Sequence, residues 1–555
     1  MNFKNLDFTA LDNWLEGQMA FYKTPGMAIA LIDNKGTLHL GTYGWVDLET
    51  RQAVTPQTLF EIGSIGKTFT AIAALQASEA GLLDLHVPIT NYLPWFLVEN
   101  KFVPITLHHL LTHSSGLIAG TDSSPAGRSE VWGLRDIEIV VPPGDNFYYS
   151  DVGYKAIGLA LQAATGQRYP ELIQRGIFDL LKMKNSVPEI THGLRPHLAK
   201  GYRHLYDDRP SHPNHPIVPA EWLETDTADG CISSTAEEMA IFARMLLNRG
   251  EGPNGRIITP ASYELMTSPL MAQDEEWSYG YGLNVFDHNG YAHIGHGGDM
   301  PGYEAYLWLD IDNQLGMAML VTQPYPPGIS FRTLEYLRAT ILTQPLPELL
   351  PPPDPTCLQT ATPEEYAGIY HLMDNKYPHH ETDQQTIPKT LLLIAEGERL
   401  LVEHNGERVP LEDRGNDRFY VNHPNFDLSL LSFGRKDNSD NGSLVVEAFH
   451  GPDWYTNENY AGLAKFDVPH EWITYPGHYR AHNPWESNFR VILRKGELLL
   501  VWPSGEEETL TPLSDGTFRI GDEQSPERLR FDQFVDEVAL RANRSGCDYY
   551  RFFTR

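Results

Sequence analysis

The chain has 555 residues, too many for a single hydrophobic core, so roughly two to four domains are expected. Its hydrophobic content of 41% and charged content of 21% are typical of a globular protein. The formal net charge of −31 disfavours nucleic acid and anionic lipid surfaces as partners, because both carry negative charge themselves.

Cysteine usage and the N-terminus bear on the compartment. Cys231, Cys357 and Cys547 lie far apart, which predicts neither a disulfide framework nor a C-x-x-C metal site, and they are expected to be buried in a reducing compartment. The first residues contain no apolar core of a secretory signal, and no run of 18 apolar residues suggests a membrane span. We therefore expect a cytoplasmic location, with a secreted chain that has lost its signal as the alternative.

The first 343 residues mix helical and strand patterns. A hairpin is expected where two apolar runs flank the turn "NKG", and a capping box of Ser234 and Glu237 is expected to start a helix. The expected elements in chain order are a helix over 8–22, strands over 27–33 and 38–46, helices over 67–81 and 234–250, strands within 305–322, and a helix over 329–344. Strands near both ends predict one sheet that joins both termini of this domain.

A proline-rich segment, 344–360, follows and is expected to be a stiff linker, because six prolines in "QPLPELLPPPDPTC" exclude helix and sheet. Beyond it, short alternating strands with Gly, Asp and Asn turns predict an all-β region. Three pairs share an offset of 99 residues: Gly397 with Gly496, Gly406 with Gly505, and Phe419 with Phe518. We expect two small antiparallel barrels, over 361–468 and 469–555, because closure removes exposed strand edges.

One histidine pair in this region, His379 and His380, is a weak candidate for metal binding. Adjacent histidines on a polar loop are more often solvated than ligated, so no metal site is predicted.

The segment "FEIGSIGKTFTAIAALQ", residues 60–76, carries the main chemical signal. Its "GKT" suggests a phosphate-binding loop, but that motif needs glycine at residue 61, where the chain has Glu61. The other interpretation is a serine nucleophile, Ser64, three residues before Lys67. Residues i and i+3 share one helix face, so the lysine amine would lie beside the serine hydroxyl and could help to activate it.

Two further segments could complete such a site. "NFYYSDVGYKAIG" places Tyr149 just before an apolar helix, where a phenol beside an ammonium group can carry protons. "HIGHGGDMPGYEAYLWLDI" places His296 on a glycine-rich strand, whose glycines allow close approach of a substrate to the backbone. Tyr149 alone would more often be a core residue, but the order of the three segments favours a shared site.

These segments resemble the motifs of class C β-lactamases and penicillin-binding-protein-like serine hydrolases, the S12 peptidase group. "EIGSIGKTFTA" is similar to the S-x-x-K helix start, "FYYSDVGYKAIG" to the Y-x-N element, and "GHGGDMPGYEAYLWLD" to the K-T-G or H-x-G strand. The resemblance covers nearly all of residues 10–343. It implies an α/β (α+β) domain of the β-lactamase/transpeptidase type, with an antiparallel sheet and a helical region. The β units after the linker are similar in architecture and length to the lipocalin-like barrels of D-aminopeptidases.

The resemblance assigns roles by position. Ser64 would be the acylated nucleophile, and Lys67 and Tyr149 would share the general acid and base work, with the first proton acceptor left open. His296 would stand where other members have a lysine that binds a substrate carboxylate. Gly298 would let the strand approach the substrate, and the backbone N–H groups of Ser64 and Asp299 would form the oxyanion hole.

The chain departs from the family pattern at two positions. Asp151 replaces the asparagine of Y-x-N and is expected to pair with Lys67, which would raise the pKa of the lysine; Asp299 adds a second carboxylate beside the glycine edge. Both are candidate substrate-binding residues, and the alternative is that both form local hydrogen bonds only. With histidine in place of lysine, the site would hold less positive charge than an anionic β-lactam needs.

The predicted function is hydrolysis of small amides or short peptides through an acyl-enzyme, with a D-aminopeptidase or D-amino-acid amidase as the favoured subtype. A carboxylesterase of the family VIII type or a D,D-peptidase is the alternative within the same chemistry. A catalytically inactive binding or scaffold protein is the alternative from another class. The resemblance implies no metal and no organic cofactor, and it leaves assembly into a homo-oligomer open.

Overall fold

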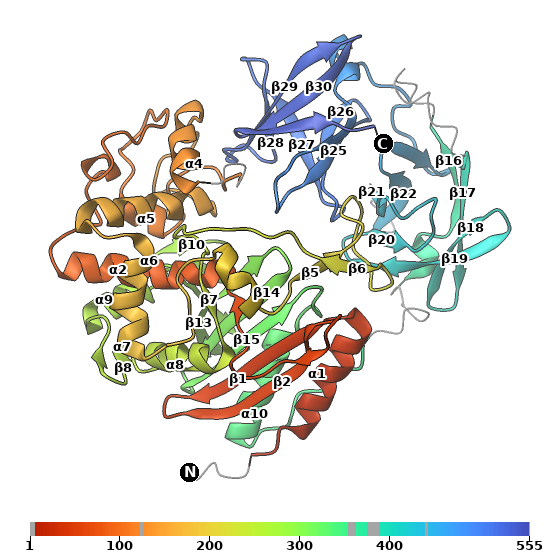
Figure 1. Cartoon of the computed structure of the whole chain (residues 1–555). Helices are drawn as coiled ribbons and strands as arrows, with labels where there is room; N and C mark the ends of the chain where they lie inside the picture. Colours follow the sequence, from red (N-terminus) through yellow and green to blue (C-terminus); the bar gives the residue numbers. More distant parts are fainter. Residues whose placement is uncertain (1–5, 122–125, 353–361, 374–387, 439–441, 554–555) are drawn as a thin grey trace. The chain divides into compact units, whose positions relative to one another are not determined.

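The computed structural model describes residues 6–121, 126–352, 362–373, 388–438 and 442–553 (Figure 1). Two compact units are formed. Unit 1 comprises Met1–Leu205, Pro216–Pro351 and Asn483–Trp485; unit 2 comprises Tyr206–His215, Pro352–His482 and Glu486–Arg555. The predicted site segments all belong to unit 1.

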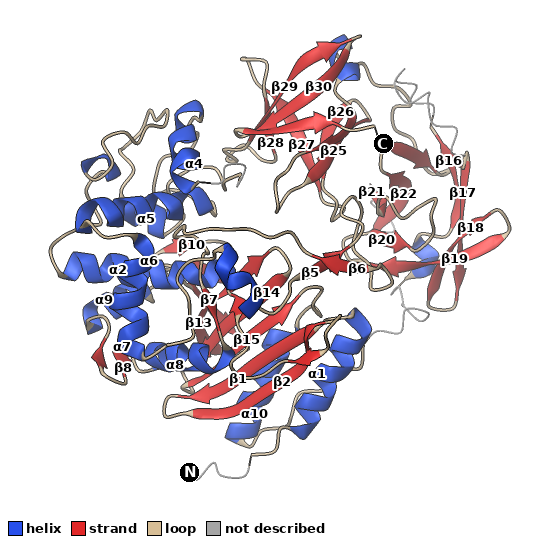
Figure 2. Cartoon of the chain, in the orientation of Figure 1, coloured by secondary structure: helices blue, strands red, loops and turns tan. Residues whose placement is uncertain are grey.

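Unit 1 contains a nine-stranded antiparallel sheet with the order β10-β11-β12-β13-β14-β15-β1-β2-β3 (Figure 2). The strands are β1 (Gly26–Asp33), β2 (Thr37–Asp47), β3 (Gln52–Ala53), β10 (Met271–Ala272), β11 (Trp277–Tyr279), β12 (Asn284–His288), β13 (Tyr291–Met300), β14 (Tyr303–Asp310) and β15 (Leu315–Thr322). Strand β1 pairs with β15, with Ala30 opposite Ala318. The sheet therefore joins the two ends of this region, as the sequence predicts.

Helices cover both faces of the sheet because its central strands are apolar on both sides. On β1, Met27, Ile29 and Leu31 belong to a core shared with α1 and α10, whereas Ala28, Ala30 and Ile32 belong to the core that contains α2, α5 and α8. The helices are α1 (Thr9–Tyr22), α2 (Gly66–Glu79), α3 (Leu107–Leu111), α4 (Gly127–Gly133), α5 (Asp151–Thr165), α6 (Tyr169–Ile173), α7 (Asp179–Leu181), α8 (Ala236–Leu247), α9 (Pro260–Met266) and α10 (Ile329–Leu342).

Three short strand pairs complete unit 1: β4 (Phe60–Glu61) with β7 (Ser233–Ser234), β5 (Tyr202–His204) with β6 (Ile217–Pro219), and β8 (Glu251–Gly252) with β9 (Gly255–Arg256). The β4–β7 pair matters for the site because it holds the chain just before Ser64, with Glu61 opposite Ser233. It also changes the start of α8. Ser234 is part of β7, so Thr235 caps the helix by accepting from the N–H of Glu238; the predicted capping box is wrong by one residue.

Unit 2 contains two closed antiparallel barrels of eight strands each. The first is formed by β16 (Gly368–Leu372), β17 (Thr390–Glu396), β18 (Arg399–His404), β19 (Glu407–Asp413), β20 (Arg418–Val421), β21 (Leu431–Asn438), β22 (Gly442–His450) and β23 (Asp453–Thr456). The second is formed by β24 (Gly477–Arg480), β25 (Asn488–Arg494), β26 (Glu497–Val501), β27 (Glu507–Pro512), β28 (Phe518–Ile520), β29 (Arg528–Val535), β30 (Val538–Arg544) and β31 (Cys547–Arg551).

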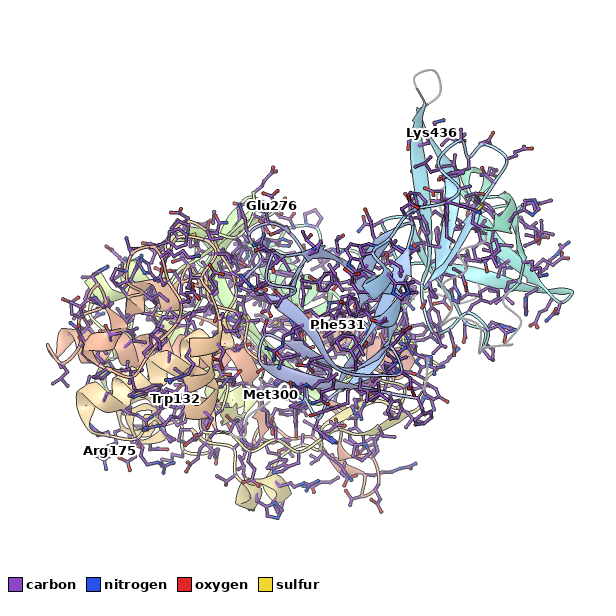
Figure 3. The ribbon with its side chains drawn as sticks, turned by 90° about the horizontal axis from the view of Figure 1, so that it is seen from above. Trp132, Arg175, Glu276, Met300, Lys436 and Phe531 are labelled. Carbon is purple, nitrogen blue, oxygen red and sulfur yellow. The ribbon has the colours of Figure 1, made fainter. Side chains whose placement is uncertain are left out.

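The barrels repeat one plan, and the 99-residue offset marks equivalent turns. Gly397 joins β17 to β18 and Gly496 joins β25 to β26, both with a positive φ that favours glycine. Buried apolar side chains fill each barrel, for example Phe531 of β29, labelled in Figure 3. The predicted architecture, an α/β domain with an antiparallel sheet and two small closed barrels after it, is confirmed.

Two sequence predictions fall partly or wholly outside the described residues. Of the cysteines, Cys231 and Cys547 are buried and form no disulfide among the described residues, and Cys357 lies outside the described part of the chain. The His379–His380 pair also lies outside it. Among the helices that the structure describes, none is both long and apolar enough to cross a membrane.

Candidate active site

Ser64 and Lys67 are in direct contact. Ser64 lies in a short 3₁₀ turn, η1 (Gly63–Ile65), that leads straight into α2, rather than in the first turn of the helix itself. The Nζ of Lys67 donates to the Ser64 Oγ over 2.8 Å. The three-residue spacing therefore does what the sequence predicts: it places the lysine amine beside the serine hydroxyl.

Lys67 is completely buried, and three groups surround its amine. Besides Ser64, Nζ contacts Asp151 Oδ1 at 2.5 Å and the main-chain carbonyl of Asp229 at 2.9 Å. Burial by itself lowers the pKa of Lys67, but Asp151, Tyr149 and Asp229 outweigh burial, and the pKa is raised above its usual range. The amine is thus an ammonium group whose three donors are all used, and Asp151 pairs with it as expected.

Tyr149 lies beside the pair of Ser64 and Lys67, and Lys67 Nζ is 4.9 Å from the centre of its ring. Burial raises the pKa of Tyr149. Its interactions with Lys67 and Ser64 favour the ionised phenol and oppose that rise in pKa without cancelling it. The tyrosine is held by its neighbour Ser150, whose side chain caps α5 by accepting from the N–H of Gly153.

The glycine-rich strand β13 runs directly against the turn that carries Ser64. A Cβ at Gly298 would lie 1.9 Å from the carbonyl oxygen of Ile62 and 3.2 Å from the main-chain nitrogen of Ser64. Gly63 has φ +49°, and a Cβ there would lie 2.7 Å from the main-chain nitrogen of Asp299. Only glycines permit this approach. It brings the main chain at Gly298 and Asp299 against the main chain at Gly63 and Ser64.

His296 is buried and neutral. Its Nδ1 faces the carbonyl of Gly297, which can only accept, so Nδ1 carries the proton and Nε2 accepts from the Tyr279 hydroxyl over 2.8 Å. Burial, followed by the nearby Lys67 ammonium group, lowers the pKa of His296 to about 3. Both ring nitrogens are satisfied within the protein, so the imidazole offers no positive charge to a substrate carboxylate.

The side chain of Asp299 lies on the face of β13 opposite to the one that carries the His296 side chain. Because strand side chains alternate, residues 296 and 299 lie on opposite faces of β13. Asp299 Oδ1 accepts from Gln323 Nε2 over 3.0 Å, and Gln323 also donates to Glu304, the residue opposite Asp299 on β14. Met300, labelled in Figure 3, is the next residue and ends the strand. The structure thus brings the backbone of Asp299 to the site and holds its side chain on the other face.

Five residues near the site were not predicted from the sequence motifs. Glu130, Lys155 and Asp229 form ionic contacts behind Lys67. His113 is buried against the ring of Tyr149, at 4.2 Å between centroids, and accepts from the N–H of Ser150. Tyr279 binds His296. Only Lys155 had a readable clue, since it lies four residues after Asp151 on one helix face.

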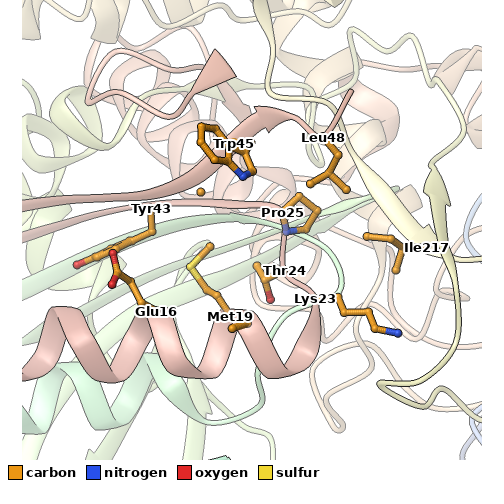
Figure 4. Close-up of a pocket in the computed structure, with 11 residues that line it drawn as sticks. Glu16, Met19, Lys23, Thr24, Pro25, Tyr43, Trp45, Leu48 and Ile217 are labelled. Carbon is orange, nitrogen blue, oxygen red and sulfur yellow. The ribbon is translucent and has the colours of Figure 1, made fainter. Parts of the chain in front are cut away.

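Outside this site, unit 1 has a pocket of about 380 Å³ between the end of α1 and β2 (Figure 4). Its walls are mostly apolar, with Met19, Pro25 and Trp45 among them, and it contains none of the predicted site residues. Within the described ranges, no three His, Cys, Asp or Glu side chains are grouped so that they could hold a metal ion.

The fold and the serine–lysine–tyrosine group define the class of protein. The Beta-lactamase family matches residues 11–340, more than half of the chain, so the protein belongs to this family of serine hydrolases. The predicted family membership is therefore confirmed.

Relatives of known name agree with this assignment. Penicillin-binding protein 4 of Amycolatopsis lactamdurans is 27% identical over 347 residues, which cover 60% of this chain and 90% of that protein. Penicillin-binding protein 4* of Bacillus subtilis (strain 168) is 24% identical over 413 residues, or 69% and 85% of the two chains. The octameric penicillin-binding protein homologue from Pyrococcus abyssi shares the fold, with a TM-score of 0.58 at 23% identity, over 81% of this chain and 100% of that one.

Proposed function

We propose that this protein hydrolyses small amides or short peptides through an acyl-enzyme on Ser64, and that substrates with a free ammonium group next to the scissile carbonyl are preferred. D-aminopeptidase or D-amino-acid amidase is the favoured subtype. The observation that carries the proposal is the hydrogen bond between the Lys67 amine and the Ser64 hydroxyl, with the Tyr149 ring beside that amine and β13 packed closely against the Ser64 turn.

The reaction begins with transfer of the Ser64 proton as Oγ attacks the carbonyl carbon. Lys67 is held as an ammonium group with its donors used, so Tyr149 in its phenolate form takes this proton, and the ammonium group stabilises the phenolate. The backbone N–H groups of Ser64 and Asp299 bind the negative oxygen of the tetrahedral intermediate. When the C–N bond breaks, Tyr149 returns the proton to the leaving amine. Water then attacks the ester by the same route and releases the acid.

The charges around the reacting carbonyl support the substrate class. His296 is neutral and internally bonded, so it gives no anchor for a carboxylate, which disfavours β-lactams and carboxypeptidase substrates. Asp151 keeps about a third of its side chain exposed while Oδ1 binds Lys67. A carboxylate accepts and does not donate, unlike the asparagine of the family motif, so Asp151 suits a protonated amine.

A panel of matched substrates tests the proposal: D- and L-residue p-nitroanilides with a free amine, their N-acetyl forms, and p-nitrophenyl esters. We expect turnover of free-amine D-anilides, a large loss on N-acetylation, and loss of all turnover in Ser64→Ala. Ser504→Ala, an exposed turn serine, is the matched control and should retain full activity. Ester turnover without anilide turnover would instead favour the carboxylesterase alternative.

Active-site labelling separates these enzymes from an inactive scaffold. A fluorophosphonate probe should modify Ser64 in the wild type and leave Ser64→Ala unmodified. An unlabelled wild-type protein would contradict the enzyme proposal. Nitrocefin turnover comparable with that of a dedicated β-lactamase would contradict the substrate class, and hydrolysis of a D-Ala-D-Ala peptide would favour the D,D-peptidase alternative.

Assembly and location remain predictions. The Pyrococcus abyssi homologue is octameric, which supports self-association of this chain as a proposal to be measured by light scattering at several concentrations. Cell fractionation would test the cytoplasmic expectation.

A further inference from the structure

A second buried ion pair lies next to the catalytic group. Lys155, one turn beyond Asp151 on α5, places its Nζ 2.7 Å from Glu130 Oε2 of α4, and the two side chains are only 4% and 5% exposed. Removing two charges from water costs about as much as their attraction returns, so a buried pair needs a reason other than stability. Glu130 is also fixed by the main chain, since its Oε1 accepts from the N–H of Thr121 over 2.6 Å.

Asp229 connects this pair to Lys67. Its main-chain carbonyl accepts from Lys67 Nζ over 2.9 Å, and its carboxylate Oδ2 lies 3.7 Å from Lys155 Nζ. Its other oxygen, Oδ1, is buried and has no hydrogen-bond partner among the described residues. One residue therefore contacts both ammonium groups, and its carboxylate depends on Lys155 for compensation.

The charge balance around the serine depends on Lys155. Two ammonium groups face three carboxylates when all are ionised; they are Lys67 and Lys155, and Glu130, Asp151 and Asp229. Without Lys155, three carboxylates would face one ammonium group. Excess negative charge makes each acid in the site hold its proton more tightly.

We propose that Lys155 is a positioning residue that sets the pH range of the reaction. Its positive charge offsets the negative charges of Asp229 and Asp151. These carboxylates then raise the proton affinity of the catalytic pair, Lys67 and Tyr149, less than they would without Lys155. It acts through the two carboxylates and contacts neither the substrate nor Ser64. The inference rests on the proposed function, in which Ser64 is the nucleophile and Lys67 and Tyr149 handle its proton.

Other charged and titratable groups also face Lys67, and none replaces Lys155. His113 and His296 are both buried, and burial lowers the pKa of each, so both are neutral. The phenol ring of Tyr154 lies 5.6 Å from Lys67 Nζ, and burial raises its pKa, so it is neutral as well. Among the described residues, the titratable groups placed against Lys67 or Lys155 from neighbouring elements are Tyr149, Asp151, Tyr154, Asp229, Glu130, His113 and His296.

The test is the rate of fluorophosphonate labelling of Ser64 as a function of pH, which requires no knowledge of the substrate. The rate should rise with pH as the proton acceptor is freed. In Lys155→Met this rising limb should move to higher pH by about one unit. At a fixed pH on the limb, the labelling reaction should then be roughly tenfold slower. In Asp229→Asn, which removes a carboxylate of the same shape, the limb should move to lower pH.

Two controls separate this role from a structural one. Lys155→Arg keeps the charge and should return the limb to its wild-type position. Arg338→Met removes a different buried cation, paired with Asp310, and should lower the melting temperature without moving the limb. If Lys155→Met does not fold, two results still test the proposal. The rising limb of the pH profile should move to lower pH in Asp229→Asn, and it should keep its wild-type position in Lys155→Arg.

The outcomes are distinct from those of the proposed function. No labelling of the wild type would contradict the function itself. If the wild type is labelled, two results would overturn the role of Lys155. One is a rising limb that does not move in Asp229→Asn; the other is a limb that moves in the same direction in Asp229→Asn and Lys155→Met. Opposite shifts with rescue by arginine would establish it.

Discussion

Two buried cation clusters in unit 1 contrast sharply, although each pairs a base with a carboxylate. In the cluster between β13, β14 and α10, Arg338 Nε contacts Asp310 Oδ2 at 2.5 Å and its Nη2 contacts His293 Nε2 at 2.6 Å. Asn313 donates to both oxygens of Asp310. His293 Nδ1 donates to the carbonyl of Tyr291, so the polar groups of this cluster are closed on one another.

The Lys67 cluster is open, in the sense that not all of its polar groups are paired within the cluster. Asp229 Oδ1 has no hydrogen-bond partner within the described residues, and Asp151 keeps part of its side chain exposed. Lys67 donates one of its hydrogen bonds to the hydroxyl of Ser64, the proposed nucleophile. A closed cluster anchors the fold, whereas an open one can exchange protons and accept a ligand. The two clusters should therefore respond in opposite ways to removal of the cation.

Removal of the Lys67 cation should have the largest effect. Lys67→Met should lower kcat/KM by roughly a thousandfold or more, because the Tyr149 phenolate loses its stabilising charge. The free energy of unfolding should change by less than about 2 kcal/mol, since Asp151 can turn towards water. Steady-state kinetics and urea denaturation measure both. A loss of stability that matches the loss of activity would contradict the distinction.

Arg338→Met should show the reverse pattern. The free energy of unfolding should fall by about 3–5 kcal/mol, because Asp310 would be left buried without its partner. Activity per folded molecule should stay within about twofold of the wild type. Denaturant titration with an activity assay on the folded fraction gives the answer, and a large loss of kcat would mean that the two clusters are coupled.

The pH dependence should reveal the open cluster alone. The reactive form has lost a proton, and the pKa values of both Lys67 and Tyr149 lie above their usual ranges. The basic form is therefore scarce at neutral pH, and kcat/KM should rise about tenfold per pH unit through the neutral and mildly alkaline range. Arg338→Met should follow the same profile. A wild-type profile that levels off below neutral pH would exclude both residues as the proton acceptor.

The smallest effect is expected from a residue outside both clusters. Thr235 caps α8, so Thr235→Ala should lower the free energy of unfolding by about 1 kcal/mol without changing kcat/KM. This variant calibrates how much activity is lost through stability alone. Thr235→Ser keeps the hydroxyl that accepts from the N–H of Glu238 and is the control; a loss of stability equal to that of Thr235→Ala would contradict the capping role.

Local signals in the sequence were enough for much of the fold. The spacing of apolar residues identified the helices around Ser64 and near both ends of unit 1, and the turn glycines identified the repeated barrels, because 3.6-residue and two-residue periods are properties of the chain itself. The start of α8 was misplaced because pairing of Ser234 with Phe60, a contact between distant segments, competes with capping.

Local spacing was enough to predict the contact between Ser64 and Lys67, since the two residues are three apart and one helical turn joins them. The sequence also identified Tyr149, the glycine edge of β13 and the pairing of Asp151 with Lys67. The charge of the site, in contrast, follows from contacts that form when the chain folds. Burial makes His296 neutral, and a contact with Gln323 fixes the direction of the Asp299 carboxylate. Contacts between separate elements also place Lys155, Glu130 and Asp229 next to Lys67. No local pattern in the sequence encodes these features.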